Sequence, residues 1–307
     1  MTAFERLDYD TAGDFLAALS PQHALWGPEP RDWCFRGQGR AEWKLSPSAL
    51  RPGASLGYAP GAATAPAPTA RAQLQAEYAL LLDFMRAADS QGLPIPDDSQ
   101  TFRTPEEWIA RVAPAVELAL TGRAYWPPSL FLSITALAQH HGVPTRLLDW
   151  SERSLIGAYF AASFGAQNPN PPDARVCVWA LNFSYLARRW PDADARVLIV
   201  TAPKASNPNL LAQSGVFTVA RIRNVDPDEA PATTPLDEVI LDGHDPSWGG
   251  PVIRQLTLPG AACPELLRRL HDEGVDAAAM FPGLDGAVQA LGERRLWDRA
   301  PGTAWRR

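Results

Sequence analysis

Cysteine, long apolar runs and excess positive charge are all scarce in this sequence, and each scarcity excludes a class of protein. The three cysteines, Cys34, Cys177 and Cys263, are odd in number and far apart, so neither a disulfide framework nor a paired-cysteine zinc site is expected. No apolar run is long enough to cross a bilayer, and acidic residues occur within the first ten positions, so we expect a cytoplasmic protein without a membrane partner. The net charge of -6 argues against unspecific coating of a nucleic-acid backbone and makes a small ligand the easier partner.

Several common catalytic motifs are missing as well. The dinucleotide fingerprint G-x-G-x-x-G begins with Gly37 and Gly39, but its third glycine position is Glu42, which would crowd a helix against the strand. A Walker loop and an H-E-x-x-H pair do not occur. The adjacent His140 and His141 would point about 100° apart on a helix, which disfavours a shared metal ion, so no metal site is expected.

What is present is the composition of a globular protein, with 46% hydrophobic and 20% charged residues in 307. Apolar residues at helical spacing, with caps and glycine stops, predict helices over 11–19, 71–88, 106–120, 130–141, 152–164, 264–271 and 284–296. Runs of β-branched and aromatic residues predict strands over 32–35, 143–150, 175–181, 196–201, 215–222 and 252–258. Helices come first and strands mostly later, without regular alternation. This order favours an α+β fold, a mixed sheet of about five or more strands with helices packed around it.

Two segments concentrate chemically active side chains. In FRGQG, residues 35–39, Arg36 is expected at the end of a strand, between Phe35 and Gly37. Glycine lets the backbone approach a ligand closely, and a guanidinium can grip phosphate bidentately. QHHGVPTRLLDWS, residues 139–151, contains Arg146 and Asp149. A functional role for these two residues and a buried salt bridge that ties the strand to a helix are equal alternatives. Ser151 has an ordinary use as the N-cap of the following helix, because no neighbouring histidine and acid are placed to activate it.

Together, FRGQGRAEWKLSPSALR and LAQHHGVPTRLLDWSERSLIGAYFAA resemble the FRG domain family of bacterial proteins, which is named after the first motif. LLAQSGVFTV and MFPGLDGAV extend the likeness, which implies an N-terminal helical extension over 1–29, one FRG-like domain over 30–292 and a tail over 293–307. The uncharged segment 52–70, rich in Ala, Pro and Gly, is expected to be a flexible insertion in that domain.

A second, weaker resemblance is to the three-part layout of ADP-ribosyltransferases, and it implies their fold and NAD as substrate. In that layout Arg36 matches the arginine that holds the NAD phosphates and ribose, and Ser151, with Asp149 beside it, falls at the motif that supports the nicotinamide ribose. Gln213 falls near the third motif, where the superfamily usually has a glutamate. A glutamine cannot take a proton, so either transfer is driven mainly by positioning, or another acid such as Glu77 or Asp149 supplies the charge, or activity is lost.

The same resemblance assigns a wider set of residues to NAD binding. The set is Arg36, Gly37, Gln38, Trp43, His141, Arg146, Trp150 and Phe217. Within it Arg146 is expected to assist Arg36 at the pyrophosphate, and the three aromatic side chains are expected either to stack on a ring or to pack in the core.

The implied function is an NAD-dependent ADP-ribosyltransferase that modifies a protein or a nucleic acid, as toxins and anti-phage effectors do, with a cognate inhibitor protein as a further partner. Two alternatives remain open: a hydrolase of NAD or a related nucleotide, and a non-enzymatic module that binds a nucleotide or nucleic acid. A wholly structural interpretation pairs Arg36 with Asp149 and leaves both motifs without a ligand.

Overall fold

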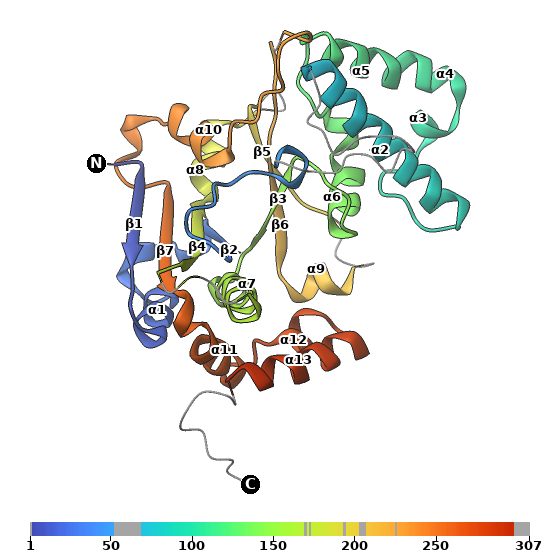
Figure 1. Cartoon of the computed structure of the whole chain (residues 1–307). Coiled ribbons are helices and arrows are strands. Elements are labelled where there is room, and N and C mark those ends of the chain that lie inside the picture. Colours follow the sequence, from blue (N-terminus) through green and yellow to red (C-terminus); the bar gives the residue numbers. More distant parts are fainter. Residues whose placement is uncertain are drawn as a thin grey trace.

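The computed structural model describes residues 2–51, 69–168, 171, 173–192, 195–202, 207–224 and 226–297. They form an α+β fold around one mixed sheet, as predicted (Figure 1). The strands are β1 (Phe4–Asp8), β2 (Trp33–Gln38), β3 (Leu147–Ser151), β4 (Arg175–Asn182), β5 (Val197–Val200), β6 (Gly215–Ala220) and β7 (Ile253–Pro259). Their order in the sheet is β1-β7-β4-β2-β3-β6-β5, and β1 and β7 are parallel while the other neighbours are antiparallel.

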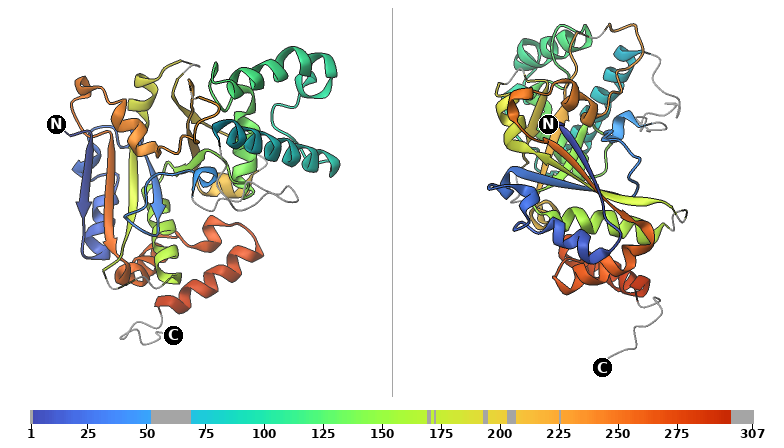
Figure 2. Two further views of the ribbon diagram at one scale, coloured as in Figure 1. Left: turned by 45° about the horizontal axis from the view of Figure 1, so that its top comes forward. Right: turned by 90° about the vertical axis from the view of Figure 1, so that its left-hand side faces the viewer.

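Helices cover both faces of the sheet. They are α1 (Ala12–Leu19), α2 (Ala70–Ser90), α3 (Gln100–Arg103), α4 (Pro105–Glu107), α5 (Ala113–Leu120), α6 (Leu132–His140), α7 (Ser154–Gln167), α8 (Phe183–Arg189), α9 (Pro208–Ala212), α10 (Leu236–Asp242), α11 (Cys263–Asp272), α12 (Ala277–Met280) and α13 (Leu284–Trp297). The helices α2, α4 and α5 gather at the end of the molecule opposite α11 and α13, which the views of Figure 2 also show.

Strand β4 has apolar side chains on both faces of the sheet, so helices must cover both faces. Its residues Val176 and Val178 belong to a core formed with α1, α7 and α11, whereas Cys177 and Trp179 belong to a second core formed with α8 and α10. Successive side chains of a strand point to opposite faces, so a strand that is apolar at every position is buried on both. The run RVCVWAL is therefore a central strand.

The sheet opens between β2 and β3. These strands pair only at Phe35 and Ser151, whereas β2 and β4 pair at six positions from Trp33 to Gln38. Beyond the single pair the two strands diverge, and the main-chain groups of β2 that face β3 are not used in a ladder. The divergence places the second half of FRGQG opposite Asp149 with space between them.

Several sequence predictions need correction. Strand β1 lies in the segment expected to be a helical extension, where charges at Glu5, Arg6 and Asp8 hide the pattern of an edge strand. Arg36 lies inside β2 rather than at its end. Ser151 ends β3, and the N-cap of α7 is Arg153.

Other predictions are confirmed within small boundary shifts. Thr11 caps α1 by accepting a hydrogen bond from Asp14 N, and a residue with positive φ, Gly142, follows the helix over 132–140. Most of the predicted insertion, residues 52–68, and residues 298–307 of the predicted tail lie outside the described residues. The first five tail residues, 293–297, belong to α13.

Candidate functional site

A cleft of about 530 Å³ lies where β2 and β3 diverge. One wall comes from residues 35–39 of β2 and the turn after it, and the opposite wall comes from Asp149, Trp150 and Ser151 of β3. Helix α7 contributes Phe160 and Phe164, and the end of α9 contributes Gln213. Three segments that are far apart in the chain therefore meet at one cavity.

Arg36 and Asp149 connect the two walls. Arg36 Nη1 donates to the main-chain oxygen of Asp149 at 2.8 Å and lies 3.5 Å from the carboxylate oxygen Oδ2. The same Oδ2 accepts a hydrogen bond from Gln139 Nε2 at 2.9 Å, and Gln139 Oε1 accepts one from Thr145 Oγ1 at 2.8 Å. The chain of bonds fixes the Asp149 carboxylate, whose side chain is 51% exposed and is thus open to a ligand.

Positive charge gathers beside this carboxylate. Withdrawal of Arg51 from water lowers the pKa of its guanidinium, the nearby charge of Arg36 lowers it further, and Asp149 raises it. Arg36 Nε is buried and has no hydrogen-bond partner among the described residues. Two guanidinium groups, one of them with an unsatisfied donor, share one carboxylate in this part of the cleft. Such a group of donors suits an anion with several oxygens, such as a phosphate.

The glycines of FRGQG have a structural use that differs from the predicted one. A Cβ atom at Gly37 would lie under 3.0 Å from the carbonyl oxygen of Gly157 and from the amide nitrogen of Ala161, both in α7. A Cβ atom at Gly39 would overlap the ring of Phe164. Gly37 lines the cleft, but its missing side chain makes room for α7 rather than for a phosphate group.

Ser151 and Gln213 are linked to each other. Ser151 Oγ donates to the main-chain oxygen of Gln213 at 2.8 Å and accepts from Arg153 N at 3.0 Å, so the hydroxyl joins β3 to the end of α9. Gln213 Nε2 donates to Met280 O at 3.2 Å. Both residues line the cleft, and Asp149 is the one carboxylate among the described residues that do. Glu77, the other acid considered as a substitute for the missing glutamate, lies elsewhere.

The aromatic residues of the predicted set differ in exposure. Trp150 and Phe217 are 3% and 1% exposed, and Trp150 Nε1 donates to Thr218 Oγ1, so both pack in the core at the floor of the cleft. Trp43 is 42% exposed and packs edge-on against Phe164, with ring centroids 5.4 Å apart. Gln38 also lines the cleft, but its Oε1 accepts from Trp179 Nε1 at 3.0 Å. Trp43 is thus the aromatic side chain of the set that can reach a ligand ring.

The two histidines take different positions. His140 lines the cleft, and its pKa is lowered, mainly because the ring is withdrawn from water and secondly because of His141, while Asp149 raises it. His141 lies outside the described lining and stacks on Phe84 with ring centroids 6.4 Å apart. The sequence prediction chose His141, and the structure places its neighbour in the cleft instead.

Arg146 is also outside the cleft. It is 3% exposed, and its Nε donates to both carboxylate oxygens of Glu77, at 3.0 and 2.7 Å. Glu77 in turn accepts from Trp126 Nε1 at 2.6 Å and from Gln73 Nε2 at 2.8 Å. Arg146 precedes β3, does not line the cleft and is bonded to Glu77, so it does not assist Arg36 there. The alternative of a buried salt bridge was right for Arg146, with Glu77 and not Asp149 as its partner.

Some lining residues escaped the sequence prediction. They are Phe35, Gly39, Arg51, His140, Phe160, Phe164, Asn209, Leu210, Gly215, Val216 and Phe281. Arg51 is the last residue of FRGQGRAEWKLSPSALR, residues 35–51, but nothing in the spacing relates it to Arg36. No cluster of three or more metal-binding side chains occurs within the described parts of the chain. In the same parts, no helix is both long and apolar enough to span a membrane.

Comparison with known families bears on the first resemblance. Residues 31–170, which include β2, β3 and α7, match the FRG domain. The chain carries an FRG domain. The match confirms the likeness predicted from FRGQG and QHHGVPTRLLDW, and it ends before Gln213, which lies outside the matched range. No curated protein and no solved structure matches the chain significantly.

Proposed function

We propose that the FRG-domain cleft binds NAD and transfers its ADP-ribose to a protein or nucleic-acid acceptor. The observation that carries the proposal is the meeting of Arg36, Asp149, Ser151 and Gln213 around one cavity of about 530 Å³, in the order that ADP-ribosyltransferases use. A cavity of that size accommodates part or all of a dinucleotide. Arg36 and Arg51 would hold the pyrophosphate, and the exposed face of Trp43 would receive a ring.

The proposed chemistry places Asp149 beside the ribose. The bond between the nicotinamide nitrogen and C1′ of the ribose breaks, nicotinamide leaves as a neutral molecule, and an acceptor nucleophile forms the new bond to C1′. Positive charge develops on the ribose in such a transition state, and a fixed carboxylate stabilises it. The Gln139 and Thr145 hydrogen bonds fix this carboxylate, and the acceptor's proton passes to it.

Release of nicotinamide tests the proposal. The full chain is incubated with NAD labelled in its adenylate part and with cell lysate, and both free nicotinamide and label on macromolecules are measured. Asp149→Asn should lower turnover by about 10²–10⁴-fold, whereas Asp242→Asn, an exposed aspartate on α10 outside the cleft, should not change it. Absence of both products from the unaltered protein would falsify the proposal.

The residue at position 213 favours a second function, binding of a nucleotide without turnover. Gln213 stands where ADP-ribosyltransferases usually have a glutamate, and its amide is bonded to Met280 O. A cleft without that acid suits a module that binds a nucleotide and does not turn it over. Saturable NAD binding that is lost in Arg36→Ala, with no nicotinamide released, selects this function. Nicotinamide release without a labelled acceptor selects a hydrolase.

A further inference from the structure

A second, smaller pocket lies at the other end of the strands that form the cleft. β3 runs from Leu147 to Ser151 and β6 from Gly215 to Ala220, antiparallel to it. The cleft uses Ser151 and Gly215, whereas the second pocket uses Arg146 and Ala220. Arg146 and Ser151 are five steps apart along extended chain, which is roughly 17 Å. The two sites are therefore separate.

Arginine dominates the lining of this pocket. Arg146, Arg196, Arg221 and Arg223 line a volume of about 250 Å³. The other lining residues are Pro47, Leu50, Tyr125, Ala220, Ile222, Asn224, Ala232, Thr234, Leu236 and Val239, so the described lining contains no carboxylate. Four cationic side chains around a small hollow repel one another unless an anion or a buried acid compensates them.

Only some of that charge is compensated by the protein. Glu77, which does not line this pocket, neutralises Arg146 through Nε. Arg221 has hydrogen bonds of its own to Ala195 O. The side chains of Arg196 and Arg223 make no ion pair and no hydrogen bond to any residue that the structure describes, and both are exposed. The charges of Arg196 and Arg223 thus remain for a ligand.

Arg146 has a buried donor that no protein group satisfies among the described residues, as expected of a residue that binds a ligand. Its side chain is 3% exposed, and Nη2 is buried without a hydrogen-bond partner among the described residues. An unsatisfied donor of a buried guanidinium costs about 1–3 kcal/mol or more, so such groups are rare unless a ligand or ion completes them. The Glu77 carboxylate accepts from Nε of this guanidinium, and Gln73 and Trp126 donate to the same carboxylate and fix its position.

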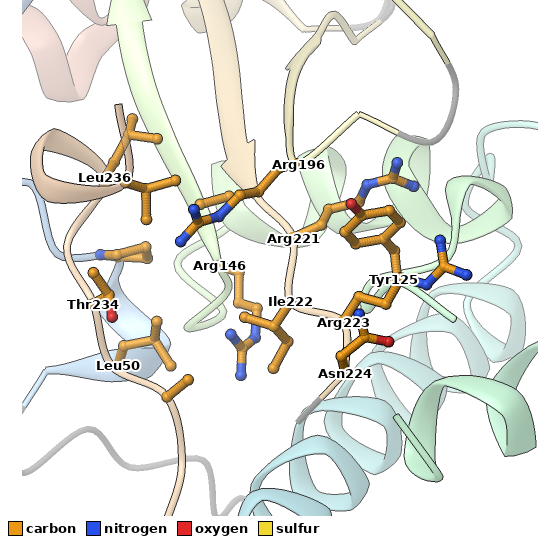
Figure 3. A pocket seen from close by; sticks show the side chains of 14 residues that line it. Leu50, Tyr125, Arg146, Arg196, Arg221, Ile222, Arg223, Asn224, Thr234 and Leu236 are labelled. Atoms are coloured by element: carbon orange, nitrogen blue, oxygen red, sulfur yellow. The ribbon is translucent and has the colours of Figure 1, made fainter. Parts of the chain in front are cut away.

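The side chains are arranged in two groups. Figure 3 shows Arg146 and Arg196 reaching into the space that Leu50, Thr234 and Leu236 border on its other side. Arg221 and Arg223 lie instead against the ring of Tyr125, with Cζ 4.6 and 5.4 Å from its centroid. Because the ring is engaged with these two guanidinium groups, it is not a free platform for a base.

We propose that this pocket binds a compact phosphorylated molecule with one or two phosphate groups. Arg146 and Arg196 grip the phosphate oxygens, Arg223 adds charge at the rim, and the apolar wall of Leu50 and Leu236 excludes water. The volume is about half that of the cleft and suits a pyrophosphate-sized anion rather than a dinucleotide. The site goes beyond the proposed function and does not depend on it.

Calorimetric titration of the full chain with sodium pyrophosphate at low ionic strength tests the proposal. Binding should occur, and Arg196→Gln should weaken it by about tenfold, because it removes a charge-assisted contact to phosphate. Arg223→Gln should weaken it as well, because it removes positive charge at the rim. Both side chains are exposed and make no ion pair with the described residues, so the variants should fold, which a thermal melt verifies. Arg294→Gln, an exposed arginine on α13, is the matched control and should bind as the unaltered protein does.

Arg36→Gln separates this pocket from the cleft. If the proposal holds, the Arg36→Gln variant still binds pyrophosphate in the second pocket, and adding Arg196→Gln to it weakens that binding. The proposal is overturned if pyrophosphate does not bind at all, if Arg196→Gln and Arg223→Gln both bind it with unchanged affinity, or if Arg36→Gln alone removes it. None of these outcomes depends on whether NAD is turned over.

Discussion

Arg36 Nη1 lies 2.8 Å from the main-chain oxygen of Asp149, a residue 113 positions later in the chain. This hydrogen bond joins the two walls of the cleft at the point where β2 and β3 stop pairing. The carboxylate of Asp149 is 3.5 Å away and turns toward Gln139, so the guanidinium is not fully neutralised. The Arg36 side chain therefore makes a structural contact through Nη1 and keeps a donor, Nε, that has no partner among the described residues.

Arg36→Lys separates those two uses. A lysine can keep one contact to Asp149 O but lacks the planar fork that grips phosphate at two points. We expect the NAD affinity to fall at least about tenfold and the free energy of unfolding to fall by no more than about 1.5 kcal/mol. Calorimetry and urea denaturation measure the two quantities. Loss of folding with unchanged NAD affinity of the remaining folded protein would support the wholly structural interpretation instead.

Gly37→Ala tests why FRGQG contains glycine. A Cβ atom there would meet Gly157 O and Ala161 N of α7 at under 3.0 Å, and backbone atoms cannot move away as side chains do. We expect a loss of about 1–3 kcal/mol or more in stability from overpacking. The matched control is Gly250→Ala, where an added Cβ meets nothing within 4 Å, and its stability should change by about 0.5 kcal/mol at most. Equal stability of the two variants in chemical denaturation would contradict the packing argument.

Glu77→Gln tests the buried ion pair beneath the second pocket. The substitution leaves the charge of Arg146, which is 3% exposed, without its partner. Breaking a buried pair in this way costs about 3–5 kcal/mol. Urea denaturation measures the loss, and Glu117→Gln, an exposed glutamate near the end of α5, serves as the control with a change of about 0.5 kcal/mol or less. An unchanged midpoint for Glu77→Gln would mean that the pair does not stabilise the fold.

The strong periodic segments made much of the fold predictable. Strands β4, β6 and β7 and the helix α7 were expected within a few residues, because each has a continuous apolar pattern bounded by glycine, proline or asparagine. Strand β1 was missed because its charges at Glu5, Arg6 and Asp8 suit an edge position that only the partner β7 defines. Propensity alone does not reveal that partner.

The sequence predicted which motifs form the site, but not which side chains contact one another there. FRGQG and QHHGVPTRLLDWS do meet, yet the choice between His140 and His141 depends on how α6 docks on β3, which no single sequence reveals. The partner of Arg146 is Glu77, 69 positions earlier on helix α2. Buried ion pairs between distant segments follow from tertiary packing and leave no local pattern.

His140 predicts a dependence of stability on pH. Withdrawal from water and the neighbouring His141 lower the pKa of the His140 ring below 6.5, against the opposing effect of Asp149. The unfolded chain then binds more protons than the folded one as pH falls below 6.5, so this contribution to stability is present above that pH and is lost below it. We expect His140→Asn to lose less stability than the unaltered protein between pH 7.5 and pH 5.5. Parallel urea denaturation at both pH values tests this, and identical losses in the two proteins would refute it.

Ser151→Ala distinguishes a structural hydroxyl from a reacting one. Ser151 Oγ donates to Gln213 O and accepts from Arg153 N, so its hydrogen and a lone pair are already engaged in joining β3 to α9. We expect a loss of about 1–3 kcal/mol in stability, because Gln213 O and Arg153 N lose their partner. Turnover of NAD, measured as nicotinamide released per folded molecule, should stay within about tenfold, far above the loss expected for Asp149→Asn. If Ser151→Ala abolishes turnover while its melting temperature is unchanged, the hydroxyl acts on the substrate and the assignment of catalysis to Asp149 is wrong.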